Sequence, residues 1–328
     1  MRLLPTTLVE TSVNPRDPRI VDVAGAVSAL RSGRLVALPT ETVYGLGANA
    51  LDPAAVARVF AVKGRPEHHP LIVHLARADL LPGWTTAVPD AAWILAERFW
   101  PGPLTIVLRR GPLASDQVTG GLGTVAVRVP DHPLTRAVLE AFGSGVAAPS
   151  ANRFGKVSPT TAAHVAEDLG DDIDAILDGG PCRVGVESTI VDLSPSDPRE
   201  WSVLRPGGLD ASVLGDALGR PLPVAMGGPK KAPGQLAHHY APNARLEVVP
   251  PAASEARLAE LEAAGRQVVR LGAHELGATA EAWAYSLYGA IRRADAARPD
   301  VIVVETPPPG ALAEAVRDRL TRASARHG

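Results

Sequence analysis

The chain has 328 residues, of which 46% are hydrophobic and 21% charged, a composition typical of a globular protein larger than one compact domain. Its 33 lysines and arginines nearly balance its 35 acidic residues, which argues against a polybasic tail and against bulk affinity for nucleic acid. The single cysteine, Cys182, excludes an internal disulfide framework and a multi-cysteine zinc or iron–sulfur site.

The sequence has no run of about eighteen apolar residues, the length that a membrane-spanning helix needs. Its first residues, MRLLPTTLVETSV, contain one arginine and no sustained apolar stretch, so they fit neither a signal peptide nor a membrane anchor. We therefore expect a cytoplasmic protein that does not bind membranes.

The first two thirds of the chain alternate between helix-like and strand-like patterns. The expected helices cover residues 22–31, 53–62, 90–99, 133–142 and 161–169, and the expected strands cover 35–38, 70–75, 104–108, 125–129, 145–148, 175–177 and 188–193. Asp52 and Pro53 are typical of a helix start, so the second helix leads into the loop that begins at Lys63. This alternation predicts an α/β or α+β domain with a substantial sheet.

Beyond Gly208 the periodic pattern weakens, and residues 219–242 are rich in proline and glycine, as linkers are. Strand patterns follow at 246–249, 267–271 and 301–305, and helix patterns at 254–264, 281–296 and 311–323. These six elements form a βαβαβα unit, for which we expect a parallel sheet. We predict one domain over residues 1–212, a linker over 213–243 and a small domain over 244–328.

Two cations stand one residue apart in Lys63-Gly64-Arg65, on a loop that glycine and the following proline define. Only four of the 33 basic residues are lysines, so a lysine kept in this background is favoured as a required point charge. Paired cations on a fixed loop suit a polyphosphate, and a solvated surface loop is the alternative interpretation.

Short polar side chains gather where expected strands end. Ser150 and Asn152 follow a buried strand in APSAN, and PTETVYG (39–45) offers two hydroxyls, a carboxylate and a phenol. Because binding crevices usually lie at the carboxyl edge of an α/β sheet, these positions suit ligand contacts, although turn formation explains Ser150 and Asn152 equally well. A second polar cluster, GVEST (185–189), precedes another expected strand.

Several common motifs are excluded by their context. G-x-G-x-x-[GA] occurs at 45–50 and 121–126 without the strand–turn–helix order of a dinucleotide site, and the P-loop pattern is absent from the sequence. His238 and His239 are adjacent on an extended segment and point apart, so we predict no structural zinc site.

The chain carries, in order, PTETVYGLGANA (39–50), KGRP with HPLIVHL (63–75), WPGPLT (100–105), VAVRVP (125–130), APSAN (148–152), GVESTIVD (185–192), LRPG (204–207) and HYAPN (239–243). These segments resemble the YrdC-like family, and the linker with the small domain resembles its two-domain threonylcarbamoyl-AMP synthases. The resemblance implies a YrdC-like twisted-sheet α/β domain with a deep basic cavity, joined to a smaller Rossmann-like α/β domain.

The resemblance also implies roles for individual residues. Lys63 and Arg65 are the expected catalytic residues. The expected ATP-binding residues are Lys63, Arg65, Thr119, Ser150, Asn152, Ser158, Arg205 and Tyr240. The expected threonine-binding residues are Thr40, Tyr44, His74, Arg128 and Ser188. It implies no metal-ligating residue.

The reaction implied by the resemblance forms L-threonylcarbamoyl-AMP from ATP, L-threonine and bicarbonate and releases pyrophosphate. Threonine's amine would take up carbon dioxide or bicarbonate, and the N-carboxylate would attack the α-phosphorus of ATP. Lys63, Arg65 and Mg²⁺ would stabilise the leaving group, and the linker with Tyr240 would form a lid that excludes water. The product would pass to a threonylcarbamoyl transferase complex that modifies adenosine 37 of tRNA, so contact with tRNA would be indirect.

Two positions depart from the family pattern. His69 stands where relatives usually have asparagine, and Gln235 where methionine is commoner, which bears on pocket polarity and lid packing. Among alternatives, the carbamoyl transfer of hydrogenase maturation is disfavoured because it goes with Cys-x-x-Cys zinc motifs. An RNA-binding module is disfavoured by the balanced charge and by an aromatic content of 4%.

Overall fold

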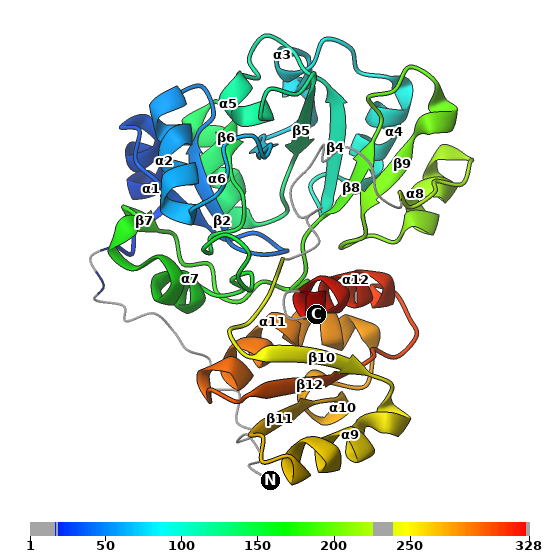
Figure 1. Ribbon diagram of the computed structural model, residues 1–328. Coiled ribbons are helices and arrows are strands. Elements are labelled where there is room, and N and C mark those ends of the chain that lie inside the picture. Colours follow the sequence, from blue (N-terminus) through cyan, green and yellow to red (C-terminus); the bar gives the residue numbers. More distant parts are fainter. Residues whose placement is uncertain (1–16, 18, 226–238, 326–328) are drawn as a thin grey trace.

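The computed structural model describes residues 17, 19–225 and 239–325, which form the two domains of Figure 1. Within these ranges, the larger domain, up to residue 225, is built on a nine-stranded sheet, and the smaller domain is built on a three-stranded sheet. Helices pack on both sheets, so the predicted α/β fold class with two domains is confirmed.

The five predicted helices of the larger domain begin and end within one residue of their expected bounds: α1 (Val23–Arg31), α2 (Pro53–Lys63), α4 (Asp90–Phe99), α6 (Pro133–Phe142) and α7 (Ala162–Leu169). The domain also has α3 (Leu81–Trp84), α5 (Asp116–Thr119) and α8 (Ala211–Leu218), with 3-10 turns at Ala78–Leu80, Gly170–Asp172 and Pro198–Glu200. Helix α2 begins where the Asp52 carboxylate accepts the N–H of Ala54 at 2.9 Å. It ends because Gly64 adopts a left-handed conformation with φ of 61°, which leaves Lys63 in the last helical turn.

The larger sheet is mixed, with the strand order β7-β1-β2-β6-β3-β5-β4-β8-β9. Its strands are β1 (Val36–Leu38), β2 (Gly45–Asn49), β3 (Ile72–His74), β4 (Leu104–Arg109), β5 (Thr124–Arg128), β6 (Val146–Ala147), β7 (Ala175–Ile176), β8 (Thr189–Asp192) and β9 (Ser202–Arg205). Successive side chains of a strand point to opposite faces. In β1, Val36 and Leu38 therefore pack with α1 and α6, whereas Ala37 packs in the core under α2 and α4.

The smaller domain is a parallel α/β unit, as predicted. Its elements are β10 (Arg245–Val249), α9 (Pro251–Ala263), β11 (Val268–Leu271), α10 (Ala273–Leu276), α11 (Ala280–Ala296), β12 (Val301–Glu305) and α12 (Ala313–Ser324). Strand β12 lies between β10 and β11, pairs with both in parallel and is buried along its whole length. Its run of apolar residues, VIVVE, is typical of a central parallel strand.

Helices α11 and α12 lie on the side of the smaller domain that faces the larger one (Figure 1). Val43 and Val186 of the larger domain belong to the same buried apolar cluster as Trp283 of α11. The approach is closest at Gly185, where a Cβ atom would lie 2.3 Å from the main-chain oxygen of Ala284. The two domains therefore share a continuous packed interface.

Besides its 3-10 turns, five elements of the larger domain were not predicted: the strands β2 and β9 and the helices α3, α5 and α8. Strand β2 has the sequence GLGAN, whose glycines hide the alternation, and a Cβ atom on Gly47 would lie 3.0 Å from side chains of Leu38 and Val146. The predicted domain boundary between 212 and 213 falls within α8. Residues 226–238 of the predicted linker, including Gln235, lie outside the described residues.

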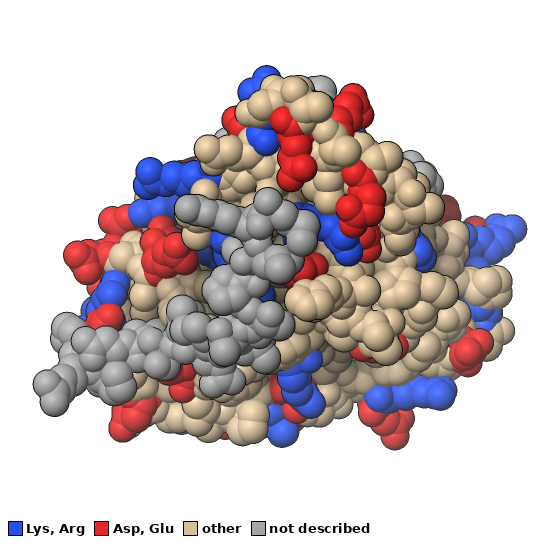
Figure 2. Space-filling model, turned by 90° about the horizontal axis from the view of Figure 1, so that it is seen from below, with Lys and Arg blue, Asp and Glu red and all other residues tan. Residues whose placement is uncertain are grey.

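None of the helices in the described ranges is long and apolar enough to cross a membrane. On the face shown in Figure 2, basic and acidic side chains are interspersed among the described residues, and neither sign covers a large area. This distribution agrees with the near balance of charges in the sequence.

Candidate active site

A buried cavity lies where several strands of the larger sheet meet the start of the smaller domain. Eight of the predicted site residues line it: Thr40, Arg65, His74, Arg128, Ser150, Ser188, Arg205 and Tyr240. The cavity has a volume of about 50 Å³, far below the several hundred Å³ of typical ligand pockets. The structure therefore shows the site in a closed form, with His239 and Tyr240 among its walls.

The sheet register explains why two predicted residues point into the cavity. Strands β3 and β5 are parallel neighbours with His74 opposite Arg128, so both side chains lie on one face. Val73 and Val127, one position earlier in each strand, point to the opposite face and into the main core. Burial, with a smaller effect of the Arg128 charge, lowers the pKa of His74 to about 3, so its imidazole is neutral.

Lys63 is 3% exposed and reaches the turn at Ser150 and Asn152. Its ammonium group donates hydrogen bonds to the main-chain oxygens of both residues. Burial, followed by the nearby charge of Arg65, lowers the pKa of Lys63 well below its ordinary value. The turn at Ser150 and Asn152, which the sequence suggests as a ligand contact, thus also fixes the ammonium group of Lys63.

Arg65, two residues after the end of α2, is buried and has no carboxylate partner among the described residues. Its guanidinium donates to the main-chain oxygen of Pro70 at 3.0 Å and lies 5.7 Å from the ring centre of Phe154, and within the described ranges its Nε has no partner. Burial lowers its pKa to about 10. Lys63 is not among the residues that line the cavity, whereas Arg65 is. Because Arg65 forms no ion pair in the described part of the chain, its side of the cavity carries a positive charge that an anion would neutralise.

Two carboxylates beside the cavity are residues that the sequence analysis quoted in motifs but gave no role. The Glu41 carboxylate lies 2.7 Å from Nη2 of Arg128, and both side chains are buried. Nη1 of Arg128 donates to the hydroxyl of Thr42 at 3.0 Å, and this hydroxyl lies 2.8 Å from that of Thr40. The second carboxylate, Glu187, lines the cavity itself.

The remaining predicted residues occupy different places. Asn152 has a buried Oδ1 without a partner in the described structure, and Ser158 donates to Glu187 at 2.6 Å. Tyr44 is not among the residues that line the cavity: its hydroxyl donates to the main-chain oxygen of Gly180 at 2.8 Å. Thr119 also lies away from the lining, at the end of α5, where its hydroxyl donates to Ser115 at 3.0 Å.

His69, the departure noted in the sequence, is buried next to this site. Its ring centre lies 5.5 Å from that of Phe154, the ring that Arg65 also contacts. His69 therefore packs against the same ring as Arg65, on the side of the cavity where we expect the phosphates of ATP.

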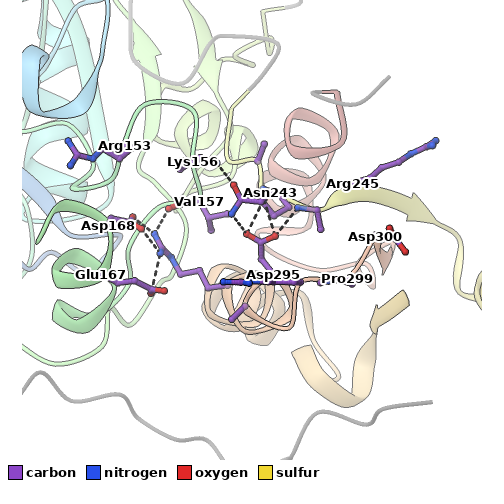
Figure 3. A pocket seen from close by; sticks show the side chains of 16 residues that line it. Arg153, Lys156, Val157, Glu167, Asp168, Asn243, Arg245, Asp295, Pro299 and Asp300 are labelled. Carbon is purple, nitrogen blue, oxygen red and sulfur yellow. Dashed lines mark hydrogen bonds and ion pairs between the residues drawn. The ribbon is translucent and has the colours of Figure 1, made fainter. Parts of the chain in front are cut away.

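A larger cleft of about 1060 Å³ opens between the domains (Figure 3). Several of its charged side chains have partners within the described structure: Arg292 lies 2.5 Å from Asp168, and Asp295 accepts the main-chain N–H of Asn243 at 2.9 Å. Several residues that line the smaller cavity have buried polar atoms without a hydrogen-bond partner among the described residues, including Arg65, His74, His239 and Tyr240. We therefore propose this cavity as the active site.

Two family models match the chain. The Sua5/YciO/YrdC model, described as "Telomere recombination", matches residues 28–207, and the model "Threonylcarbamoyl-AMP synthase, C-terminal domain" matches residues 211–325. The chain belongs to the Sua5/YciO/YrdC family.

Among the similar proteins, one from Pyrococcus abyssi named threonylcarbamoyl-AMP synthase is 43% identical over 320 residues, covering 91% of this chain and 93% of that protein. A Bacillus subtilis protein of the same name is 40% identical, with 96% of each chain covered. The crystal structure of P. abyssi Sua5 complexed with L-threonine matches with a TM-score of 0.87 and 41% identity, over 92% of this chain and 94% of that one.

In this member of the Sua5/YciO/YrdC family, the residues that line the cavity come almost entirely from the segment matched by the first model. His239 and Tyr240 are the two lining residues from the segment matched by the second. The family's larger domain therefore supplies the basic pocket, and the chain that enters the smaller domain closes it.

Proposed function

We propose that this protein synthesises L-threonylcarbamoyl-AMP from ATP, L-threonine and bicarbonate and releases pyrophosphate, the first step of threonylcarbamoyladenosine formation in tRNA. The observation that carries the proposal is the pair of buried basic side chains, Lys63 and Arg65, which lack carboxylate partners in the described structure and lie at the polar pocket. The names of the relatives that match over nearly the whole chain support the same reaction.

The two sides of the cavity suit the two substrates. Lys63 and Arg65 bind the phosphates, with the turn at Ser150 and Asn152 and with Arg205 and Ser158 completing the ATP site. Threonine is held by Thr40, His74, Arg128 and Ser188 on the opposite wall. The neutral imidazole of His74 suits this wall because it adds no positive charge that would repel an amine. The proposed roles of Tyr44 in threonine binding and of Thr119 in ATP binding stay predictions. Neither residue lines the cavity, so each side chain would have to move to reach a substrate.

The reaction needs no covalent enzyme intermediate. Threonine's neutral amine nitrogen bonds to the carbon of carbon dioxide, one C=O electron pair moves onto oxygen, and the nitrogen loses a proton; with bicarbonate, a C–O bond breaks instead and water leaves. The N-carboxylate oxygen then bonds to the α-phosphorus of ATP. The bond from that phosphorus to the bridging oxygen breaks, and its electron pair leaves with pyrophosphate. Lys63 and Arg65 act by stabilising the negative charge that gathers on this leaving group.

Mg²⁺ would enter with ATP. It prefers phosphate oxygens, water and one or two carboxylates. The carboxylates near the cavity, Glu41 and Glu187, are each paired with an arginine in the described structure. The ATP phosphates would therefore supply most of the ligands, and the ion would add to the charge stabilisation that the two cations provide.

The closed cavity implies that the wall at His239 and Tyr240 must move for ATP to enter. Closure afterwards would protect the carbamate and the mixed anhydride from hydrolysis. The product would then pass in the cytoplasm to a threonylcarbamoyl transferase complex, with tRNA contacted by that complex.

The test is release of pyrophosphate from ATP with threonine and bicarbonate omitted in turn. The wild-type protein should release pyrophosphate only when both threonine and bicarbonate are present. Release that continues when one of them is omitted would overturn the proposal. Lys63→Met should lower kcat/KM at least about a hundredfold, the usual cost of losing a preorganised charge at a transition state. Arg136→Met, which removes an exposed cation on α6, is the matched control.

A further inference from the structure

The carboxylate of Glu187 lines the cavity, yet two of its three side-chain hydrogen-bond donors come from the smaller domain. Oε1 accepts from the hydroxyl of Ser158 at 2.6 Å. Oε2 accepts from the hydroxyl of Tyr288 on α11 at 2.9 Å and from Nε of Arg319 on α12 at 2.7 Å. Tyr288 and the Arg319 side chain are both fully buried, so the orientation of this carboxylate depends on helices 101 and 132 residues further along the chain.

The same two residues hold Tyr240. The Arg319 guanidinium lies 5.1 Å from the ring centre of Tyr240, and the Tyr240 ring stacks on that of Tyr288 with centres 5.8 Å apart. Tyr240 has a φ of 63°, a left-handed conformation that non-glycine residues rarely adopt. A strained backbone persists where its surroundings fix it, and here Arg319 and Tyr288 form those surroundings.

Glu187 connects these contacts to the substrate-binding wall. Its main-chain oxygen accepts the N–H of Gly208 at 3.0 Å, and the main-chain oxygen of the next residue, Ser188, accepts from the Arg205 guanidinium at 2.8 Å. Burial raises the pKa of Glu187, but the charges of Arg319 and Arg205 outweigh burial and lower it to about 2. The carboxylate is therefore a fixed negative charge and not a proton carrier at neutral pH.

We propose that Arg319 and Tyr288 are positioning residues for the reaction: by fixing the Glu187 carboxylate and the Tyr240 ring, the smaller domain completes the active site of the larger one. The inference rests on the proposed function and assigns the smaller domain a part in it. Neither residue has to touch a substrate, since each acts through Glu187 and Tyr240.

The alternative is that these contacts only attach one domain to the other. Another contact of α12 with the larger domain allows the two interpretations to be separated. Asp210 accepts the main-chain N–H of Leu312, at the start of α12, at 3.2 Å, and it does not line the cavity. On α11, Tyr285 is 44% exposed and lies three residues before Tyr288, so it serves as the matched tyrosine.

The experiment compares Arg319→Met with Asp210→Ala, and Tyr288→Phe with Tyr285→Phe, in the full-length protein. Steady-state pyrophosphate release is measured against ATP and against threonine, below the thermal midpoint of each variant. We expect kcat/KM for ATP to fall about tenfold in Tyr288→Phe and at least about a hundredfold in Arg319→Met, since each loses hydrogen bonds to a charged group. Arg319→Lys should recover part of the loss, and both control variants should stay within about twofold of wild type.

Two results would overturn the inference. One is kcat/KM within about twofold of wild type in Tyr288→Phe and Arg319→Met. The other is an equal loss in Asp210→Ala and Arg319→Met, which would mean that attachment of α12 alone matters. Tyr288→Phe changes one hydroxyl, so it decides the question if Arg319→Met does not fold. A wild-type protein without threonine-dependent release would instead refute the proposed function itself.

Discussion

Replacing Glu187 with glutamine should remove a pH-dependent part of the stability of this protein. The pKa of Glu187 falls from the ordinary 4.5 to about 2, because Arg319, Arg205 and the Ser158 hydroxyl outweigh the effect of burial. A carboxyl group with a depressed pKa stabilises the folded state above the unfolded pKa and loses that contribution as the pH falls toward the folded pKa. The difference between the two pKa values corresponds to about 3 kcal/mol of unfolding free energy.

The assay is equilibrium unfolding by urea at a series of pH values between 7 and 2. At neutral pH, Glu187→Gln should be less stable than wild type by about 3–5 kcal/mol, because it removes one partner of a buried ion pair and leaves Arg319 with Asp318 alone. As the pH falls from 4.5 to 2, the difference in unfolding free energy between the wild type and Glu187→Gln should narrow by about 3 kcal/mol. Glu262→Gln, on the exposed side of α9, should show a small and constant difference. A gap for Glu187→Gln that stays constant down to pH 2 would refute the reasoning.

Two further predictions concern a cation and a glycine. Burial lowers the pKa of Lys63, and a bound phosphate should raise it again by favouring the charged ammonium group. ATP binding should therefore take up protons. The affinity for ATP should fall as the pH rises from the pKa of Lys63 in the free protein to its pKa in the complex. Calorimetry in buffers of different ionisation enthalpy measures this uptake, which Lys63→Met should reduce; buffer-independent heats in the wild type would contradict it. Gly185→Ala should lower the free energy of unfolding by about 1–3 kcal/mol more than Gly143→Ala, as measured by thermal unfolding. Both glycines have positive φ, but only a Cβ atom at Gly185 would clash, at 2.3 Å from the main-chain oxygen of Ala284. Equal losses would show that the domains adjust without strain.

Much of the fold could be predicted because its elements carry strong local signals. Strand β12 was predicted with its observed bounds, since four consecutive apolar residues precede Glu305, and α2 was predicted from the start signal of Asp52 and Pro53. Strand β2 could not be predicted in the same way: its glycines have no side chains to alternate, and only the close packing against neighbouring strands explains them.

The site could be predicted where one loop carries the chemistry and not where distant segments combine. Lys63 ends α2 and Arg65 follows two residues later, so their proximity is visible in the sequence. The Glu187 carboxylate stood in a quoted motif, but its partners on α11 and α12 lie more than a hundred residues away, and no spacing rule connects them. The hydroxyl of Tyr44 donates to the main-chain oxygen of Gly180, a contact that the sequence motif does not indicate, and its role in threonine binding stays a prediction.

The placement of Arg319 near the end of α12 also affects the order of events during synthesis. The larger domain leaves the ribosome first, and domains generally fold as units during translation. Until α12 has been made, Glu187 lacks its ion-pair partner Arg319, and the apolar cluster between the domains lacks Val316 and Leu320. A nascent chain or a fragment that ends before this helix would therefore present an exposed apolar surface and an unfinished pocket, so the protein gains its completed site only with its last helix.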